Sequence, residues 1–144
     1  METMEKDCKE LPKGCRFVRL PMVSDSRGKL AFGEGSNQIP FDIKRVFWTY
    51  DILPSADRGD HAHRTCQMVL FPLGGSYRIV LDDGCCQVPV LMDDPSVGVL
   101  IPPLVWCSLS DFSEHAACVC LASHPYEPED YIHDYQEFLS LTAQ

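Results

Sequence analysis

The sequence predicts an all-β domain of the sandwich or small-barrel type, followed by one short helix near the C-terminus. Short runs rich in β-branched and aromatic residues recur along the chain and are separated by turn residues. The 11 prolines and 9 glycines are spread over the whole length, as a chain with many turns requires. No apolar pattern with a helical period of useful length precedes residue 128. Short, evenly spaced strands of this kind are typical of sandwiches and small barrels.

The expected strands follow one another at short intervals. In chain order they cover residues 16–20, 29–32, 44–50, 61–70, 76–81, 87–91, 97–101, 106–109 and 116–122. Turns or loops are expected at 25–28, 33–37, 54–60, 72–75 and 82–84. The segment KRVFWTY is the clearest strand, because it combines β-branched and aromatic residues. Asp82-Asp83-Gly84 predicts a hairpin, since an Asp-Gly pair readily adopts positive φ.

The helix is expected over residues 128–141. Tyr131, Tyr135 and Phe138 fall at i, i+4 and i+7, which places them on one face. Pro128 suits a first helical turn, and acidic residues follow it there.

Length and composition indicate one globular domain over residues 1–144, with 1–15 as an N-terminal extension. The formal net charge is −9, from 12 basic and 21 acidic residues. Such a surface repels nucleic acid and anionic membranes, so neither is expected as a partner. An anionic ligand would need a local group of arginines.

The lack of a recognisable targeting signal, together with the cysteine spacing, predicts a cytoplasmic protein. No run approaches the ~20 apolar residues of a membrane helix, and the charged N-terminus lacks the apolar core of a signal peptide. The eight cysteines are therefore expected as reduced thiols, with Cys118 and Cys120 acting as small buried hydrophobes.

The clearest local feature is the pair His61 and His63. On a strand, residues two apart point to the same face, so both imidazoles project together and Ala62 points away. Two imidazoles on one face are costly to bury without partners, which favours a functional site. His115, His124 and His133 show no such pattern and are expected outside the site.

The spacing around this pair matches the first cupin motif. Gln67 follows where the motif has glutamate, and Gly74 completes it. A second motif, at residues 98–106, is followed by Cys107 in place of the usual histidine, on a strand expected opposite the histidine strand. Without the carboxylate the hold on a divalent cation is weaker, so no metal is expected. A zinc site of two histidines and Cys107 is the alternative.

A larger set of segments resembles one branch of the cupins, the WxcM-like dTDP-4-keto-6-deoxyglucose 3,4-ketoisomerases. The matching segments are 25–28, 39–41, 44–46, 58–59, 61–64, Gln67, 75–76, 81–84, 101–103, 105–106, 121–123 and 130–132. They span roughly four fifths of the chain, and their common order and spacing make chance agreement improbable.

The resemblance implies a double-stranded β-helix jelly roll, a homodimer with exchanged N-terminal strands, and catalysis without metal or cofactor. It implies that His61 and His63 move protons on a dTDP-linked 4-keto-6-deoxyhexose, shifting the ketone from C4 to C3 through an enediolate. Guanidinium groups suit a diphosphate, so substrate contacts are expected from Arg45, Arg58 and Arg27. Gln67 and Cys107 are expected to face the same substrate. Arg27 suits a surface ion pair equally well.

Other functions remain open from the sequence. They are a sugar-nucleotide-binding cupin without activity, a metal-dependent cupin oxygenase, and an epimerase, which would need a histidine–aspartate pair and a tyrosine acid.

Overall fold

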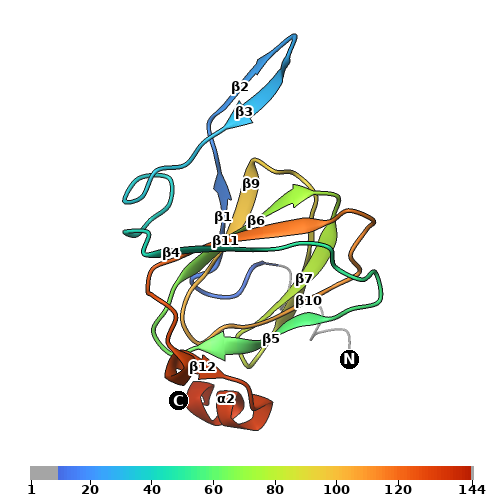
Figure 1. Cartoon of the computed structure of the whole chain (residues 1–144). Coiled ribbons are helices and arrows are strands. Elements are labelled where there is room, and N and C mark those ends of the chain that lie inside the picture. Colours follow the sequence, from blue (N-terminus) through green and yellow to red (C-terminus); the bar gives the residue numbers. More distant parts are fainter. Residues whose placement is uncertain (1–9, 144) are drawn as a thin grey trace.

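The computed structural model describes residues 10–143 and shows two five-stranded antiparallel sheets that face each other (Figure 1). The strands are β1 (Arg16–Arg19), β2 (Met22–Asp25), β3 (Gly28–Ala31), β4 (Arg45–Thr49), β5 (Arg58–His63), β6 (Met68–Gly74), β7 (Tyr77–Asp82), β8 (Gln87–Met92), β9 (Val97–Ile101), β10 (Trp106–Ser110), β11 (Ala117–Ala122) and β12 (Tyr131–Ile132). A 3₁₀ turn, η1 (Pro128–Asp130), and one helix, α2 (Tyr135–Thr142), complete the chain. The predicted all-β class with a short C-terminal helix is confirmed.

The strand order shows the jelly roll. One sheet runs β1-β9-β6-β11-β4 and the other runs β12-β5-β10-β7-β8, so neighbours in space are mostly distant in sequence. Along β8 and β11 every second residue is buried, because one face of each strand covers the core and the other meets solvent. Tyr77, Ile79, Leu81 and Val99 are fully buried between the two sheets.

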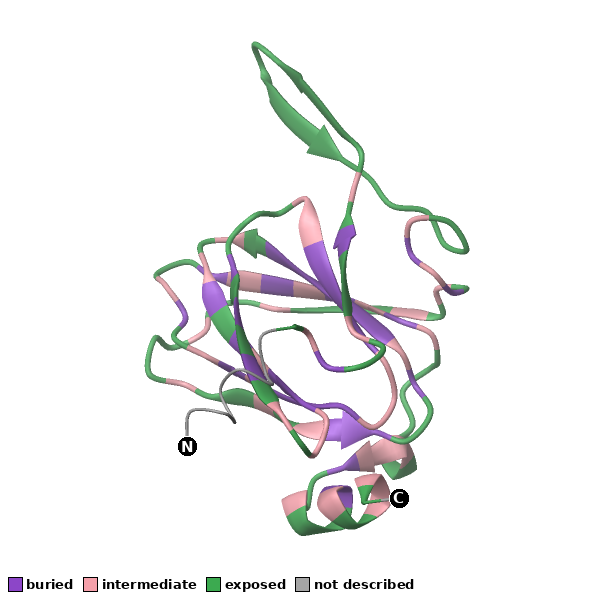
Figure 2. Cartoon of the chain, turned by 180° about the vertical axis from the view of Figure 1, so that it is seen from behind, coloured by how far each residue is buried: buried purple, intermediate pink, exposed green. Residues whose placement is uncertain are grey.

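The hairpin β2–β3 stands apart from this body. Its two strands pair with each other, every residue in them is exposed, and the hairpin projects away from both sheets (Figures 1 and 2). The turn expected at 25–28 lies at its tip, whereas strand β2 was not predicted.

The single strand expected over 61–70 is wrong, since β5 and β6 belong to different sheets. The chain turns a corner between them, where the Asp130 carboxylate accepts hydrogen bonds from the amides of Thr65 and Cys66. The amide of Gln67 then donates to Ser123 Oγ. These distant partners override the local strand pattern.

The predicted helix begins at Tyr135 rather than Pro128. Residues 128–130 form the 3₁₀ turn and β12 pairs with β5, so strand pairing and the contacts of Asp130 outweigh the helical period. The side chain of Asp134 accepts from the amide of Gln136 and caps the true start. Within 10–143 no helix is long and apolar enough to span a bilayer.

At the N-terminal end, part of the expected extension belongs to the folded body. Leu11 and Cys15 pack against the main core, whereas residues 1–9 lie outside the described part of the chain.

Helix α2 packs against the face of β5 that carries Ala62. Its Phe138 is fully buried with Trp106 of β10, Ile132 of β12 and Ala62 of β5. Figure 1 shows the helix beneath the sheet that carries these strands. The strand with both histidines is thus held from its rear face.

Replacing Phe138 by alanine is expected to lower the free energy of unfolding by about 3–5 kcal/mol, because it leaves a cavity behind β5. Urea denaturation measures this. Gln136→Ala, an exposed change on the same helix, should alter stability by less than about 0.5 kcal/mol. Equal effects of the two substitutions would contradict the packing role.

Candidate active site

Strand β5 brings His61 and His63 together as expected from their spacing. Their ring centroids lie 5.1 Å apart in an edge-to-face arrangement. Ala62 between them is buried on the opposite face, against α2. A bulge opposite Cys107 and Ser108, with Asp60 at a φ of 59°, precedes the pair and adjusts the direction of the strand.

His61 is oriented by its own strand. Its Nδ1 lies 3.1 Å from the carbonyl oxygen of Gly59. A carbonyl oxygen only accepts hydrogen bonds, so Nδ1 carries the proton and Nε2 keeps a free lone pair.

His63 is oriented by a carboxylate. Its Nδ1 lies 3.0 Å from Asp130 Oδ2. Burial raises the pKa of Asp130, but hydrogen bonds from Thr65, His63 and the Cys66 amide outweigh this and leave the pKa below its ordinary value. The ionised carboxylate therefore accepts from Nδ1–H. Nε2 of His63 is buried and has no hydrogen-bond partner within residues 10–143.

Burial also sets the charge of both imidazoles. It lowers the pKa of His63 to about 4, against the opposing effect of the hydrogen bond to Asp130. It lowers the pKa of His61 as well, with a smaller opposing contribution from the Gly59 carbonyl. At neutral pH the site therefore presents two neutral imidazoles, each with Nε2 available as a base.

An aromatic wall beside the histidines comes from β12 and its flanks. The Tyr131 ring lies 4.3 Å from His63 and 5.0 Å from His61. His133 stacks on Tyr131 at 5.6 Å and lies 5.9 Å from His61. His133 is exposed, as expected of a surface histidine, but its ring borders the site.

Asp130 and Tyr131 were also missed as site residues. The helical period assigned them to a helix, and only the pairing of Tyr131 with His63 across β12 and β5 reveals their place. Their presence in the matching segment 130–132 was the one signal in the sequence.

Arg45 joins the site from the opposite sheet. Its guanidinium donates to the Tyr131 hydroxyl at 3.4 Å and stacks over Phe47 and Tyr126 at 5.1 and 5.6 Å. Its Nε is buried and, like His63 Nε2, has no partner in the described part of the chain. Two such atoms around one tyrosine indicate a place for a polar ligand.

A cavity of about 100 Å³ lies beside His61, between the two sheets. Arg58 of β5 and Cys107 of β10 line it together with His61. Cys107 lies directly across from His61 on the paired strand β10, and both line the same cavity. Burial raises the pKa of its thiol to about 12, which keeps it neutral.

Two further candidates, Gln67 and Arg27, do not line this cavity. The backbone of Gln67 is bonded to Ser123 at the corner between β5 and β6, and the residue does not line the cavity. Arg27 lies at the tip of the projecting hairpin, where it forms an exposed ion pair with Asp25 at 2.7 Å.

Potential metal ligands converge at a different place from the expected histidine–histidine–cysteine set. In residues 10–143, the group whose ligand atoms lie within 4.8 Å of one another is His63, Cys66 and Asp130. The Asp130 carboxylate already accepts from the Thr65 amide and hydroxyl and from the Cys66 amide. It acts here as an anchor for the corner and for His63.

The family is decided by the comparison with family models. The model described as FdtA: WxcM-like, C-terminal, matches residues 13–143. The chain belongs to the WxcM-like family.

Relatives of this WxcM-like chain are sugar ketoisomerases. A TDP-4-oxo-6-deoxy-α-D-glucose-3,4-oxoisomerase from Aneurinibacillus thermoaerophilus is 38% identical over 129 residues, which cover 90% of this chain and 93% of the relative. The structure of QdtA, a sugar 3,4-ketoisomerase from Thermoanaerobacterium thermosaccharolyticum in complex with TDP, has 34% identity and a TM-score of 0.90, covering 92% and 97% of the two chains. WlaRB, a TDP-quinovose 3,4-ketoisomerase from Campylobacter jejuni, has 36% identity and a TM-score of 0.86, covering 90% and 99%.

The ionisation of the two histidines is testable by NMR. At pH 7, ¹⁵N shifts should show both rings neutral, with protonated Nδ1 and free Nε2. On acidification His63 should titrate near pH 4 and His61 below its ordinary value of 6.5. A His63 that is protonated at pH 7 would contradict the burial argument.

Proposed function

We propose that this protein is a 3,4-ketoisomerase of a dTDP-linked 4-keto-6-deoxyhexose in deoxyamino-sugar biosynthesis. The observation that carries the proposal is the pair of neutral imidazoles whose Nδ1 atoms are both engaged, which leaves both Nε2 atoms unprotonated. Its relatives act on such sugars by their names, and a QdtA variant was crystallised with TDP-4-keto-6-deoxyglucose. The thiols and the sugar-nucleotide substrate fit a cytoplasmic location.

The geometry suits a proton transfer between neighbouring carbons. In a 4-keto sugar the carbonyl acidifies the proton on C3. One imidazole removes this proton, which leaves an enediolate across C3 and C4, and returns it to C4. The other imidazole moves the proton from the C3 hydroxyl to the C4 oxygen, so that the ketone now stands at C3. No external oxidant or reductant is needed, because the two carbons exchange oxidation states.

His63 has a carboxylate partner that His61 lacks. When its Nε2 accepts a proton, the imidazolium is stabilised by the Asp130 carboxylate 3.0 Å from Nδ1. The Tyr131 hydroxyl, held by Arg45, lies in the same group of side chains and offers a further hydrogen-bond donor to a sugar oxygen.

Replacing His61 or His63 by asparagine should lower turnover about 10²–10⁴-fold, because an amide cannot carry a proton near neutral pH. Proton NMR of dTDP-4-keto-6-deoxyglucose in deuterated water measures both ketone migration and exchange at carbon. Retained binding of dTDP is the control for folding. Near-normal turnover by both variants would refute the proposal.

The same experiment separates the alternative functions. The histidine–aspartate pair and the adjacent tyrosine favour epimerisation as the second candidate, which would change the configuration of a carbon and leave the ketone at C4. Binding of dTDP without turnover or exchange would indicate a sugar-nucleotide-binding protein.

Arg45 and Arg58 are proposed to hold the diphosphate. Both flank the histidines, and the overall charge of −9 makes local guanidinium groups necessary for an anion. Arg45→Gln and Arg58→Gln should each weaken dTDP binding about tenfold or more in calorimetric titration. Arg78→Gln, which breaks an exposed ion pair with Asp111 elsewhere, should leave it unchanged. Unaltered affinity in both site variants would refute the assignment.

We further propose a homodimer in which the β2–β3 hairpin lies on a second copy of the chain. The hairpin exposes Met22, Val23 and Leu30, and Phe32 just after it is exposed as well. Neither hairpin strand pairs with a strand of the two five-stranded sheets. Apolar side chains of this kind are stabilised by a partner surface. The tip would bring Arg27 to the partner's site, where a third guanidinium could face the diphosphate.

Sedimentation should show a dimer that Val23→Asp combined with Leu30→Asp converts to a monomer. Leu91→Asp, an equally exposed change on β8, should leave the dimer intact. Mixed dimers of Arg27→Ala and His61→Asn chains should regain turnover above either parent, since one site then has both residues. A monomeric parent protein would contradict the arrangement.

A further inference from the structure

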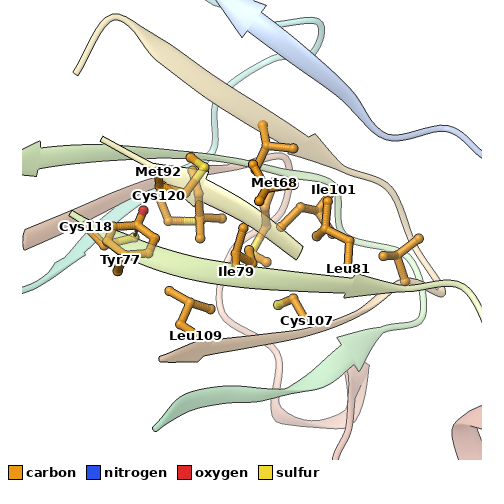
Figure 3. Packing of buried hydrophobic residues seen from close by; sticks show 14 of the residues in the cluster. Met68, Tyr77, Ile79, Leu81, Met92, Ile101, Cys107, Leu109, Cys118 and Cys120 are labelled. Carbon is orange, nitrogen blue, oxygen red and sulfur yellow. Dashed lines mark hydrogen bonds between the residues drawn. The ribbon is translucent and has the colours of Figure 1, made fainter. Parts of the chain in front are cut away.

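The cavity beside His61 has an unusual inner surface. Apart from His61, Arg58 and Gly59, its lining comes from both sheets and is mostly apolar, with Thr49 as the one hydroxyl: Phe47, Thr49, Met68, Leu70, Cys107, Leu109, Cys118 and Cys120. Figure 3 shows Cys107 and Leu109 on β10, across the core from Met68 and Cys120 of the other sheet. Apart from His61, Arg58 and the Thr49 hydroxyl, the surface of the cavity is therefore sulfur and hydrocarbon.

The thiols that line the cavity carry no charge. Burial raises the pKa of Cys107 to about 12 and that of Cys118 to about 11. The Tyr77 hydroxyl, which could make this region polar, donates to Cys118 Sγ at 3.1 Å. Apolar cavities of this kind stay dry and favour apolar occupants.

The size and position of the cavity limit what can enter. Its volume of about 100 Å³ exceeds the ~30 Å³ that one water molecule occupies in the liquid, so a small substituent enters with room to spare. A nucleoside does not fit. The occupant must therefore be a small apolar part of a ligand whose polar part remains at His61 and Arg58.

A 4-keto-6-deoxyhexose carries one such group. Its C6 methyl is attached to C5, next to the reacting C4, and lies about 2.5 Å from C4. With C3 and C4 at the histidines, the methyl is the substituent that needs no hydrogen bond and lies close enough to enter the cavity. The oxygens at C2, C3 and C4 require polar partners instead.

We propose that this thiol-lined cavity receives the C6 methyl group and makes the protein select 6-deoxy sugars over sugars with a 6-hydroxyl. This inference rests on the proposed ketoisomerase function. A hydroxyl in the cavity would lose its bonds to water and find a neutral, largely apolar surface. Pockets of this type reject an added hydroxyl by about 10²-fold and distinguish one methyl group by about 10- to 200-fold.

The test compares kcat/KM on three dTDP-linked 4-keto sugars: the 6-deoxyhexose, its 6-hydroxy counterpart, and the pentose that lacks C6. The 6-deoxy sugar should exceed the 6-hydroxy sugar by about 10²-fold and the pentose by about tenfold or more. Equal kcat/KM on the 6-deoxy and 6-hydroxy sugars, with normal turnover, would overturn this inference alone. Absence of turnover and of carbon exchange on all three would overturn the proposed function together with it.

Two substitutions locate the effect in the cavity. Cys118→Leu fills it and should lower kcat/KM on the 6-deoxy sugar about tenfold or more while leaving the pentose unchanged. Cys107→Ser adds a hydroxyl to the lining of the cavity and should raise the ratio of 6-hydroxy to 6-deoxy turnover. The thiol of Cys15 packs on the core outside the cavity. Cys15→Ser should therefore change neither kcat/KM on the 6-deoxy sugar nor the ratio of 6-hydroxy to 6-deoxy turnover. Equal losses on all three sugars in Cys118→Leu, with dTDP binding retained, would also overturn the inference. If that variant does not fold, the three-sugar comparison on the parent protein decides.

Discussion

The Asp130 carboxylate is the interaction on which the site depends. It accepts hydrogen bonds from the Thr65 and Cys66 amides, which turn the chain from β5 into β6, and from His63 Nδ1, which orients the imidazole. The turn of chain that carries it then continues into β12, which pairs with β5 beside His63. One side chain thus links the corner between the two sheets to the ionisation and direction of a proposed base.

Burial and charge act together around the two histidines. Removing imidazole from water lowers its pKa, and the same burial would raise that of Asp130 if hydrogen bonds did not oppose it. The result is a neutral base beside an ionised carboxylate, a pair that accepts a proton on the imidazole without leaving an isolated buried charge. The protein as a whole carries a charge of −9, so binding of a diphosphate falls to the few guanidinium groups near the site.

The space between the two sheets adds a mostly apolar cavity to the site. Beside His61 and Arg58 lies a cavity whose remaining lining is mostly sulfur and hydrocarbon, with one hydroxyl from Thr49. The resemblance predicts histidine at position 107. The cysteine found there has a smaller side chain, and its buried thiol carries no charge. The same position therefore contributes to packing, since it belongs to the main core, and to the surface that a sugar would meet.

The sequence by itself determined the all-β class, most strand positions and the common face of His61 and His63. These follow from local rules: residue propensities, turn residues and the period of two along a strand. The sequence also indicated the family through segments whose order and spacing resemble one branch of the cupins. The places of Asp130, Tyr131 and His133 beside the histidines were decided by the tertiary structure, because strand pairing with β5 overrode a helical period that is equally visible in the sequence. The tertiary structure also decided three other features: the neutrality of both imidazoles, the place of Cys107 beside His61, and the separation of Arg27 from the site of its own chain. They depend on burial and on contacts between residues far apart in the chain, which no local pattern encodes.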